Sequence, residues 1–209
     1  MRPLHIKTVA LAACLAGLAA LPSAAANLSK TYSYFTVGGT TLEQLEIELD
    51  TRGPQVKSTG RRHPGATQME FSTRVTYDDK GSYCRIAMAT VTVKARMILP
   101  RWRQRSKAAA DVRVIWDTLA ADIKRHEESH VVIARTHARE MEMELEKLRR
   151  QKTCSRLAED AKAVNARILA KHDKAQERFD RVEGINFERR MLRLLRYRIE
   201  RIDNGQLPG

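Results

Sequence analysis

The strongest constraint on the fold is a long stretch with helical periodicity and no helix breaker. Between Ala108 and about Lys152 the sequence contains neither glycine nor proline. Its apolar residues recur in steps of three and four, the spacing of one face of an α-helix. These residues are Val112, Trp116, Leu119, Ile123, Ile133, Met141, Leu145 and Leu148. We therefore predict one long helix with a buried face.

Within this stretch lies the motif His-Glu-x-x-His, with its histidines one helical turn apart at His126 and His130. Two imidazoles at this spacing can hold one Zn²⁺ ion, and Glu127 would then act as general base on a zinc-activated water. His126, His130 and His137 fill gaps in the apolar stripe, so the motif faces the core. Buried histidines are unfavourable without partners. The pattern predicts a zinc site, and core histidines satisfied by hydrogen bonds are the alternative.

The N-terminus has the pattern of an export signal. Arg2 and Lys7 accompany an apolar run from Thr8 to Leu21, and small residues follow as far as Ala26. The run is too short to span a bilayer comfortably, and we predict cleavage after Ala26. The segment Leu11-Ala12-Ala13-Cys14 resembles the lipid-attachment box of bacterial lipoproteins, which is the less favoured alternative. We expect an exported protein, either periplasmic or secreted.

Cysteine content and charge narrow the possible partners of the mature chain. Cys84 and Cys154 remain after cleavage, and an oxidising compartment makes one disulfide the default, with two buried thiols as the alternative. Loss of Arg2 and Lys7 lowers the formal net charge from +13 to +11. Such a charge suits an acidic substrate, an acidic polymer or anionic lipid headgroups, and equally a well-solvated surface. We expect no nucleic acid, because export removes the usual target and the basic residues lack interleaved aromatic residues.

Ahead of the long helix, alternating sequence predicts a small antiparallel β-sheet with a short helix. Residues 32–37 form a first strand, and an amphipathic helix follows from about Thr40 to Arg52. Two longer strands are predicted over 68–77 and 84–97, joined by a hairpin-type turn. The second of these changes its alternation near Thr90, which indicates a β-bulge or a twist unless both faces are covered there.

Two further helices are expected after the long one. Thr153-Cys154-Ser155 marks a reversal, after which an amphipathic run from Leu157 to Val182 ends at Gly184. A third, basic helix spans 188–202. The predicted fold is α+β, with the long helix packed against one or two C-terminal helices. The expected divisions are a signal peptide at 1–26, an α+β domain at 27–184 and a basic C-terminal helix and tail at 185–209.

A catalytic zinc ion needs a third protein ligand. His137 lies roughly 10 Å along the helix axis from His130, at ~1.5 Å per residue, which is too far to share one ion. Antiparallel packing of the second helix places His130 opposite the neighbourhood of Gln176. The candidates within reach are His172, Asp180 and Glu183. We slightly prefer Glu183, which gives a His-His-Glu site, and His172 is the runner-up.

In their order along the chain, these features resemble a known family. They are Cys84 in a strand, Ile98-Leu99-Pro100-Arg101-Trp102, the His-Glu-x-x-His helix and Cys154. The chain looks like the bacterial domain of unknown function that is described as a predicted secreted zinc-dependent protease, and the similarity covers about residues 32–184. Many members carry Tyr-Asp-x-x-Thr-x-His-Gly after the helix. This chain has Phe179-Asp180-Arg181-Val182-Glu183-Gly184, without that histidine.

The resemblance implies a zincin-like domain with zinc ligands at His126 and His130 and a catalytic Glu127. It also implies a disulfide between Cys84 and Cys154. The function that we expect is a zinc metallopeptidase that hydrolyses peptide bonds in a peptide or protein substrate. The alternative is a non-catalytic envelope protein, in which the helices form a scaffold and the basic tail binds anionic partners or a membrane surface. A third possibility is a structural zinc ion without turnover.

Overall fold

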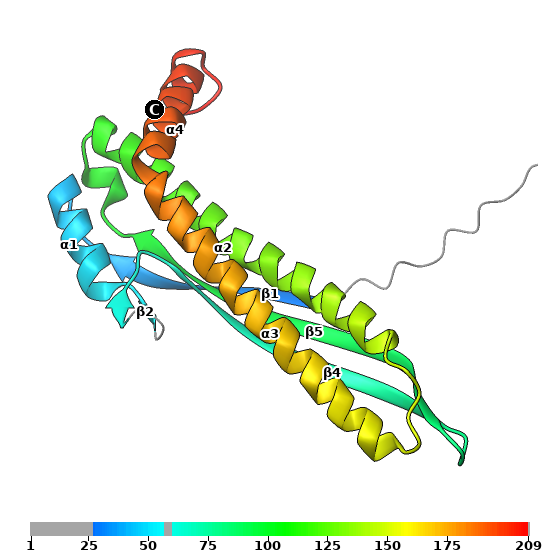
Figure 1. Ribbon diagram of the computed structural model, residues 1–209. Coiled ribbons are helices and arrows are strands. Elements are labelled where there is room, and N and C mark those ends of the chain that lie inside the picture. The colour runs from blue at the N-terminus through cyan, green and yellow to red at the C-terminus, as the bar shows by residue number, and fades with distance from the viewer. Residues whose placement is uncertain (1–26, 57–59, 209) are drawn as a thin grey trace, which may run out of the picture.

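The computed structural model describes residues 27–56 and 60–208, so the predicted signal peptide and Cys14 lie outside the described residues. The fold is α+β (Figure 1). Its main sheet has three strands in the order β1-β5-β4. These are β1 (Asn27–Val37), β4 (Ala66–Asp79) and β5 (Cys84–Trp102), while β2 (Gln55–Val56) and β3 (Arg61–Arg62) form a separate two-stranded ribbon. The α-helices are α1 (Leu42–Arg52), α2 (Ala110–Glu146), α3 (Cys154–Ile185) and α4 (Phe187–Asp203).

The main sheet is mixed, which corrects the prediction of a wholly antiparallel one. β4 and β5 form the expected antiparallel hairpin. However, β1 runs parallel to β5, with Asn27 opposite Thr92 and Val37 opposite Trp102. Parallel neighbours need a long connection, and the chain between β1 and β5 provides one through α1, the ribbon and β4.

The predicted irregularity in β5 is a bulge that lies slightly before Thr90. Thr76 pairs with Met88 but Tyr77 pairs with Ile86, so Ala87 is the extra residue. One extra residue reverses which side chains point to the core. Beyond the bulge the buried residues alternate on one face, at Ala89, Val91, Val93, Ala95, Met97 and Leu99.

The antiparallel helices α2 and α3 cover one face of this sheet along their length (Figure 1). The core between the two layers is apolar, and its buried members are mostly alanines and aliphatic side chains. They include Val91, Val93, Ala134, Ala138, Met141, Leu145, Ala161 and Ile168. α2 ends at Glu146, earlier than its sequence pattern suggests. The reason is that the backbone of Gln151 hydrogen-bonds in both directions to Cys84, which keeps this segment extended.

α4 follows α3 after Asn186 and packs its buried Met191 side against the N-terminal half of α2. Two arginines of α4 secure this contact. Arg190 pairs with Asp122 at 3.1 Å, and Arg198 donates to the backbone oxygen of Asp117 at 3.2 Å. Among the described residues, no helix combines the length and apolar character needed to cross a bilayer.

Candidate metal centre

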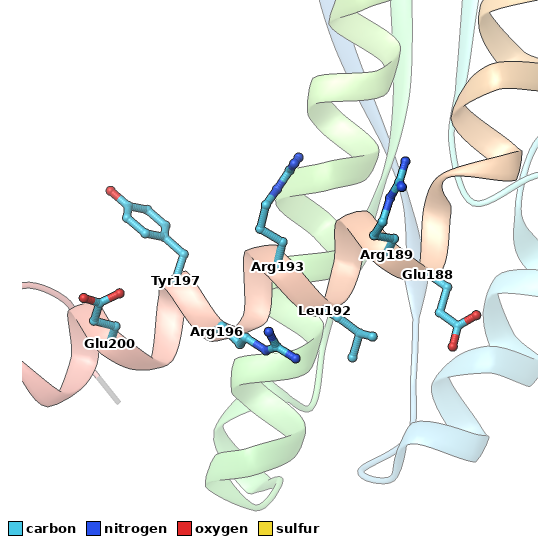
Figure 2. A pocket seen from close by; sticks show the side chains of 7 residues that line it. All are labelled: Glu188, Arg189, Leu192, Arg193, Arg196, Tyr197 and Glu200. Carbon is cyan, nitrogen blue, oxygen red and sulfur yellow. The ribbon is translucent and has the colours of Figure 1, made fainter.

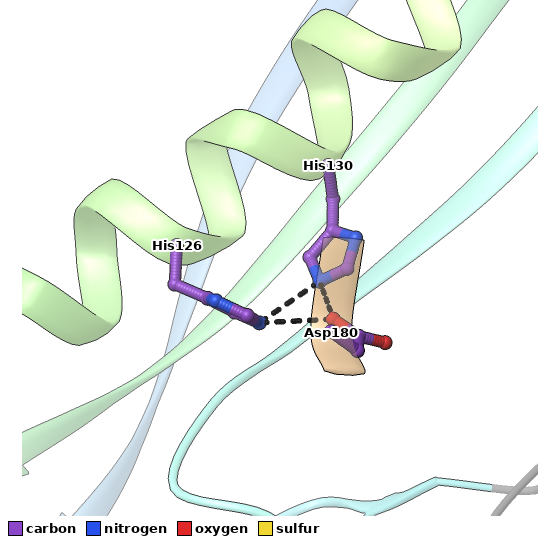
Figure 3. Close-up of side chains that lie close together, drawn as sticks. All are labelled: His126, His130 and Asp180. Carbon is purple, nitrogen blue, oxygen red and sulfur yellow. Dashed lines mark hydrogen bonds and ion pairs between the residues drawn. The ribbon is translucent and has the colours of Figure 1, made fainter. Parts of the chain in front are cut away.

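His126 and His130 project from α2 toward α3, on adjacent turns of the helix (Figure 3). Their Nε2 atoms lie 3.1 Å apart, and the two rings meet edge to face. Phe179 of α3 packs against both rings, with centroid distances of 4.9 Å to His126 and 5.1 Å to His130. This aromatic contact restricts the rotation of both imidazoles, so the two nitrogen atoms are held in place by packing.

Asp180 supplies the third ligand atom from α3. Its Oδ1 lies 3.2 Å from Nε2 of His126 and 3.0 Å from Nε2 of His130. With bonds of ~2.0–2.1 Å, two ligands of a tetrahedral ion lie roughly 3.3 Å apart. The three separations are therefore close to the edges of one tetrahedral face, and among the described residues this is the group whose ligand atoms converge as a metal site. Two imidazoles and one carboxylate fit zinc.

Glu127 lies beside this cluster and is buried, with 5% of its surface exposed. Thr67 of β4 donates a hydrogen bond to its Oε2 at 2.7 Å. Burial raises the pKa of Glu127, while the Thr67 hydrogen bond and the two nearby histidines act in the opposite direction. Gly65 allows the chain to pass close to this carboxylate, because a Cβ there would lie 2.8 Å from Oε1 of Glu127.

Burial and the contacts between His126, His130 and Asp180 shift the pKa values of His130 and Asp180 in opposite directions. Burial lowers the pKa of His130, but hydrogen bonds to Asp180 and Gln176 outweigh burial and leave the pKa raised. For Asp180, burial favours the neutral acid, but the two histidines more than compensate and hold the pKa of its carboxyl well below the usual range. Asp180 is therefore an anion at neutral pH, as a metal ligand must be.

Residues 32–188 match the model of a family described as a bacterial protein of unknown function, DUF922. The chain belongs to the DUF922 family. The match extends from β1 to the first residues of α4, so it contains the whole histidine-aspartate cluster. No curated protein and no solved structure matches the chain.

In this DUF922 domain, Glu183 is not one of the converging ligand atoms, although it is the slightly preferred sequence candidate. Its carboxylate binds the guanidinium of Arg125, and Arg190 lies 3.4 Å away. The nearest histidine atom is Nδ1 of His126, at 3.7 Å, on the ring edge that faces away from the cluster. The geometry thus favours Asp180 as third ligand and places Glu183 behind His126.

The other histidine candidates also lie outside the cluster. His172 is buried one helical turn before Gln176, where its Nε2 lies 2.8 Å from the amide nitrogen of Gln176. His137 contacts the ring of His172 at 5.7 Å and hydrogen-bonds to the backbone oxygen of Ile133. Both are therefore core histidines with hydrogen-bond partners.

Sequence reasoning placed Gln176 near His130 but did not predict its hydrogen bonds, and it did not predict the contacts of Thr67 and Phe179. Asp180 was one of the three side chains within the predicted reach of His130, and that register was the available signal for it. No sequence signal pointed to Thr67, because its contact with Glu127 joins residues 60 positions apart.

A cavity of about 500 Å³ opens beside the cluster in the DUF922 domain. Its walls come from the chain that enters β4, from α2, from α3 and from the start of α4. The residues nearest the chemistry are Thr67, His126, Glu127, His130, Asp180 and Arg190. The candidate ligands and the candidate base thus face one space that is large enough for part of a peptide.

The domain also contains a disulfide between Cys84 and Cys154, which joins the start of β5 to the start of α3. Cys84 is fully buried. A buried disulfide in a bacterial protein indicates an oxidising compartment, which agrees with export from the cytoplasm.

Proposed function

We propose that this protein is an exported zinc-dependent peptidase, with His126, His130 and Asp180 as metal ligands and Glu127 as general base. The observation that carries the proposal is the convergence of three ligand atoms at 3.0–3.2 Å beside a buried carboxylate in the same cavity. A site with three protein ligands leaves a coordination position open, which distinguishes catalytic from structural zinc sites.

Each residue has a defined task in this proposal. When bound, zinc supplies a Lewis acid that polarises a peptide carbonyl and makes water more acidic. Glu127 accepts a proton at its carboxylate and returns it to the leaving amine. Burial raises its pKa toward the pH at which it works, which improves its efficiency as base and then as acid. Thr67 orients the carboxylate through the hydrogen bond to Oε2.

Glu128 does not interfere with this chemistry. It is a charged residue between the catalytic glutamate and the second histidine, where uncharged residues are usual in peptidases. Its carboxylate accepts a hydrogen bond from the hydroxyl of Tyr32 in β1 at 2.9 Å. The side chain therefore points away from the cavity, and it provides a matched control for Glu127.

The test combines metal analysis with turnover by two paired variants. Purified mature wild-type protein is expected to contain one zinc per chain and to cleave casein or a peptide library. Glu127→Gln should keep the zinc and lose activity by about 100-fold or more, the usual contribution of a general base. Glu128→Gln should retain both. Absence of zinc, or equal activity in the wild type and Glu127→Gln, would overturn the proposal, as would bound zinc without turnover.

A second function is favoured by the exposed face of α4. In Figure 2, Arg189, Arg193 and Tyr197 project from the same side of this helix. Among the described residues, no ion pair holds Arg193 or Arg196, and Leu192 beside them is half exposed. We infer that this face contacts an anionic lipid surface, because arginines with interspersed apolar side chains suit charged headgroups.

Vesicle sedimentation tests this contact with the intact mature protein. Binding to vesicles that contain phosphatidylglycerol should exceed binding to neutral phosphatidylcholine vesicles and should weaken as salt is added. The triple change of Arg189, Arg193 and Arg196 to glutamine should abolish the difference. The same change at Arg61, Arg74 and Arg96, on the β-strands, is the control. Equal binding by wild type and the α4 variant would contradict the inference.

A further inference from the structure

Gln176 of α3 lies behind His130 and makes three polar contacts there. Its amide nitrogen lies 3.1 Å from the backbone oxygen of His130 and 2.8 Å from Nε2 of His172. Its amide oxygen lies 2.6 Å from Nδ1 of His130. A backbone oxygen can only accept a hydrogen bond, so the atom that faces it must be the NH₂ group. The orientation of the amide is therefore fixed by the backbone of α2.

This orientation decides which nitrogen of His130 carries the proton. The amide oxygen is an acceptor, so Nδ1 of His130 must donate to it. In a neutral imidazole the other nitrogen then has a free lone pair. That nitrogen is Nε2, the atom that faces His126 and Asp180.

His172 completes the arrangement on the other side of Gln176. The second N–H of the amide points to Nε2 of His172, which must accept. The proton of His172 is then on Nδ1, where the carboxylate of Asp173 receives it at 2.9 Å. Burial lowers the pKa of His172, which favours the neutral ring that this pattern requires. The hydrogen bonds therefore run in one direction: His130 donates to Gln176, Gln176 donates to His172, and His172 donates to Asp173.

We propose that Gln176, supported by His172 and Asp173, is a positioning residue that holds His130 in its metal-binding tautomer before any metal arrives. The inference deepens the proposed function and rests on it for its purpose, since the tautomer matters only if His130 is a ligand. Partners that orient ligating histidines typically contribute 10–100-fold to metal affinity.

The two histidines differ in this respect. Nδ1 of His126 faces Glu183 at 3.7 Å, beyond hydrogen-bond length, so its tautomer is not fixed. Its Nε2 lies 3.1 Å from Nε2 of His130, and Oδ1 of Asp180 lies within 3.2 Å of both nitrogens. The hydrogen bond to Gln176 therefore keeps a proton on Nδ1 of His130 with and without zinc, whereas the 3.7 Å separation from Glu183 sets no such requirement on His126.

Nitrogen-15 NMR of the mature protein, labelled at histidine, shows which imidazole nitrogens carry a proton. Without metal, Nδ1 of His130 and Nδ1 of His172 should each be protonated. With zinc, Nδ1 of His130 should keep its proton. A metal-free His130 without a proton on Nδ1 would overturn the inference. If the wild type binds no zinc, the proposed function fails, and the metal-free spectrum still decides the tautomer.

Variants of Gln176 distinguish its hydrogen bond to His130 from its contribution to packing. Gln176→Leu removes the acceptor, so His130 should populate both tautomers and the zinc Kd should rise 10–100-fold. Gln176→Glu keeps an acceptor for Nδ1–H but loses the amide donors to the backbone of His130 and to His172, so it should restore the Nδ1 proton and only part of the affinity. Glu177→Gln, an exposed neighbour on α3, is the control and should match the wild type. Equal loss in both Gln176 variants, or no loss in either, would contradict the inference.

Discussion

Asp180 and Glu183 lie one helical turn apart on α3, yet their carboxylates have different neighbours. Asp180 contacts the Nε2 atoms of both histidines, whereas Glu183 is held by two arginines. Removing a direct ligand should weaken zinc binding more than removing a carboxylate behind a ligand. We therefore expect Asp180→Asn to lose more than about 100-fold in zinc affinity and Glu183→Gln to lose about 10-fold or less.

Competition titration with a chromophoric chelator measures both dissociation constants in the same buffer. Circular dichroism of each variant checks that the helical content is retained. A reversed order, with Glu183→Gln the weaker binder, would identify Glu183 as the third ligand and exclude the assignment to Asp180.

Thr67 should control the pH dependence of activity through Glu127. A general base works only when it is deprotonated, so activity falls as pH drops through its pKa. The Thr67 hydrogen bond lowers that pKa against the effect of burial. Thr67→Val removes the hydrogen bond, raises the pKa further and should move the acid limb of kcat/KM to higher pH.

The control for this variant is Thr73→Val on the same strand, where the hydroxyl lies 3.5 Å from the sulfur of Met141. Its pH profile should match that of the wild type. An acid limb that stays in place in Thr67→Val, or moves to lower pH, would show that Thr67 does not act on the catalytic base.

At the scale of elements, periodicity predicted what each segment is but not how segments pair. The alternation of residues 68–77 and 84–97 was sufficient for the β4–β5 hairpin, because a short turn allows only antiparallel pairing. β1 has no such local constraint, and alternation is the same in parallel and antiparallel strands, so its direction was predicted wrongly. The end of α2 was also beyond sequence reasoning, because Gln151 is kept extended by Cys84, far away in the chain.

The disulfide should stabilise the domain without affecting the metal site. It joins residues 70 positions apart, and crosslinks of this kind typically contribute 2–4 kcal/mol. We expect the double change of Cys84 and Cys154 to alanine to lower the free energy of unfolding by about that amount in urea denaturation. Zinc affinity should remain near the wild-type value, because about 26 residues of α3, or ~40 Å, separate Cys154 from Asp180.

Unchanged stability in the double variant would mean that the two layers hold together by packing alone. A large loss of zinc affinity with unchanged stability would contradict the prediction. It would mean that the disulfide influences the metal site from the opposite end of α3. Single cysteine variants are less informative, because each leaves one free thiol that can form new disulfides.

At the scale of the whole molecule, the pairing of α2 with α3 is the part of the site that could be predicted from the sequence. Counting from the expected reversal near Thr153 placed Gln176 opposite His130, and these two side chains are hydrogen-bonded. The register of the hairpin was therefore correct. Which acidic residue completes the cluster depends on side-chain directions within one helical turn, and on arginines of α2 and α4 that draw Glu183 aside. Such competition among neighbours is not visible in periodicity.

The positions of the disulfide and the candidate metal site have a mechanical consequence. α2 and α3 lie side by side as an antiparallel pair (Figure 1). The disulfide is at the first residue of α3, near the turn that joins the two helices, and Asp180 is near the opposite end of α3. An ion shared by His126, His130 and Asp180 would add a reversible link between the two helices, beside the ion pair of Arg125 with Glu183. Loss of the ion would then leave α3 held near both of its ends, by the disulfide to β5 at one end and by the ion pair to α2 at the other.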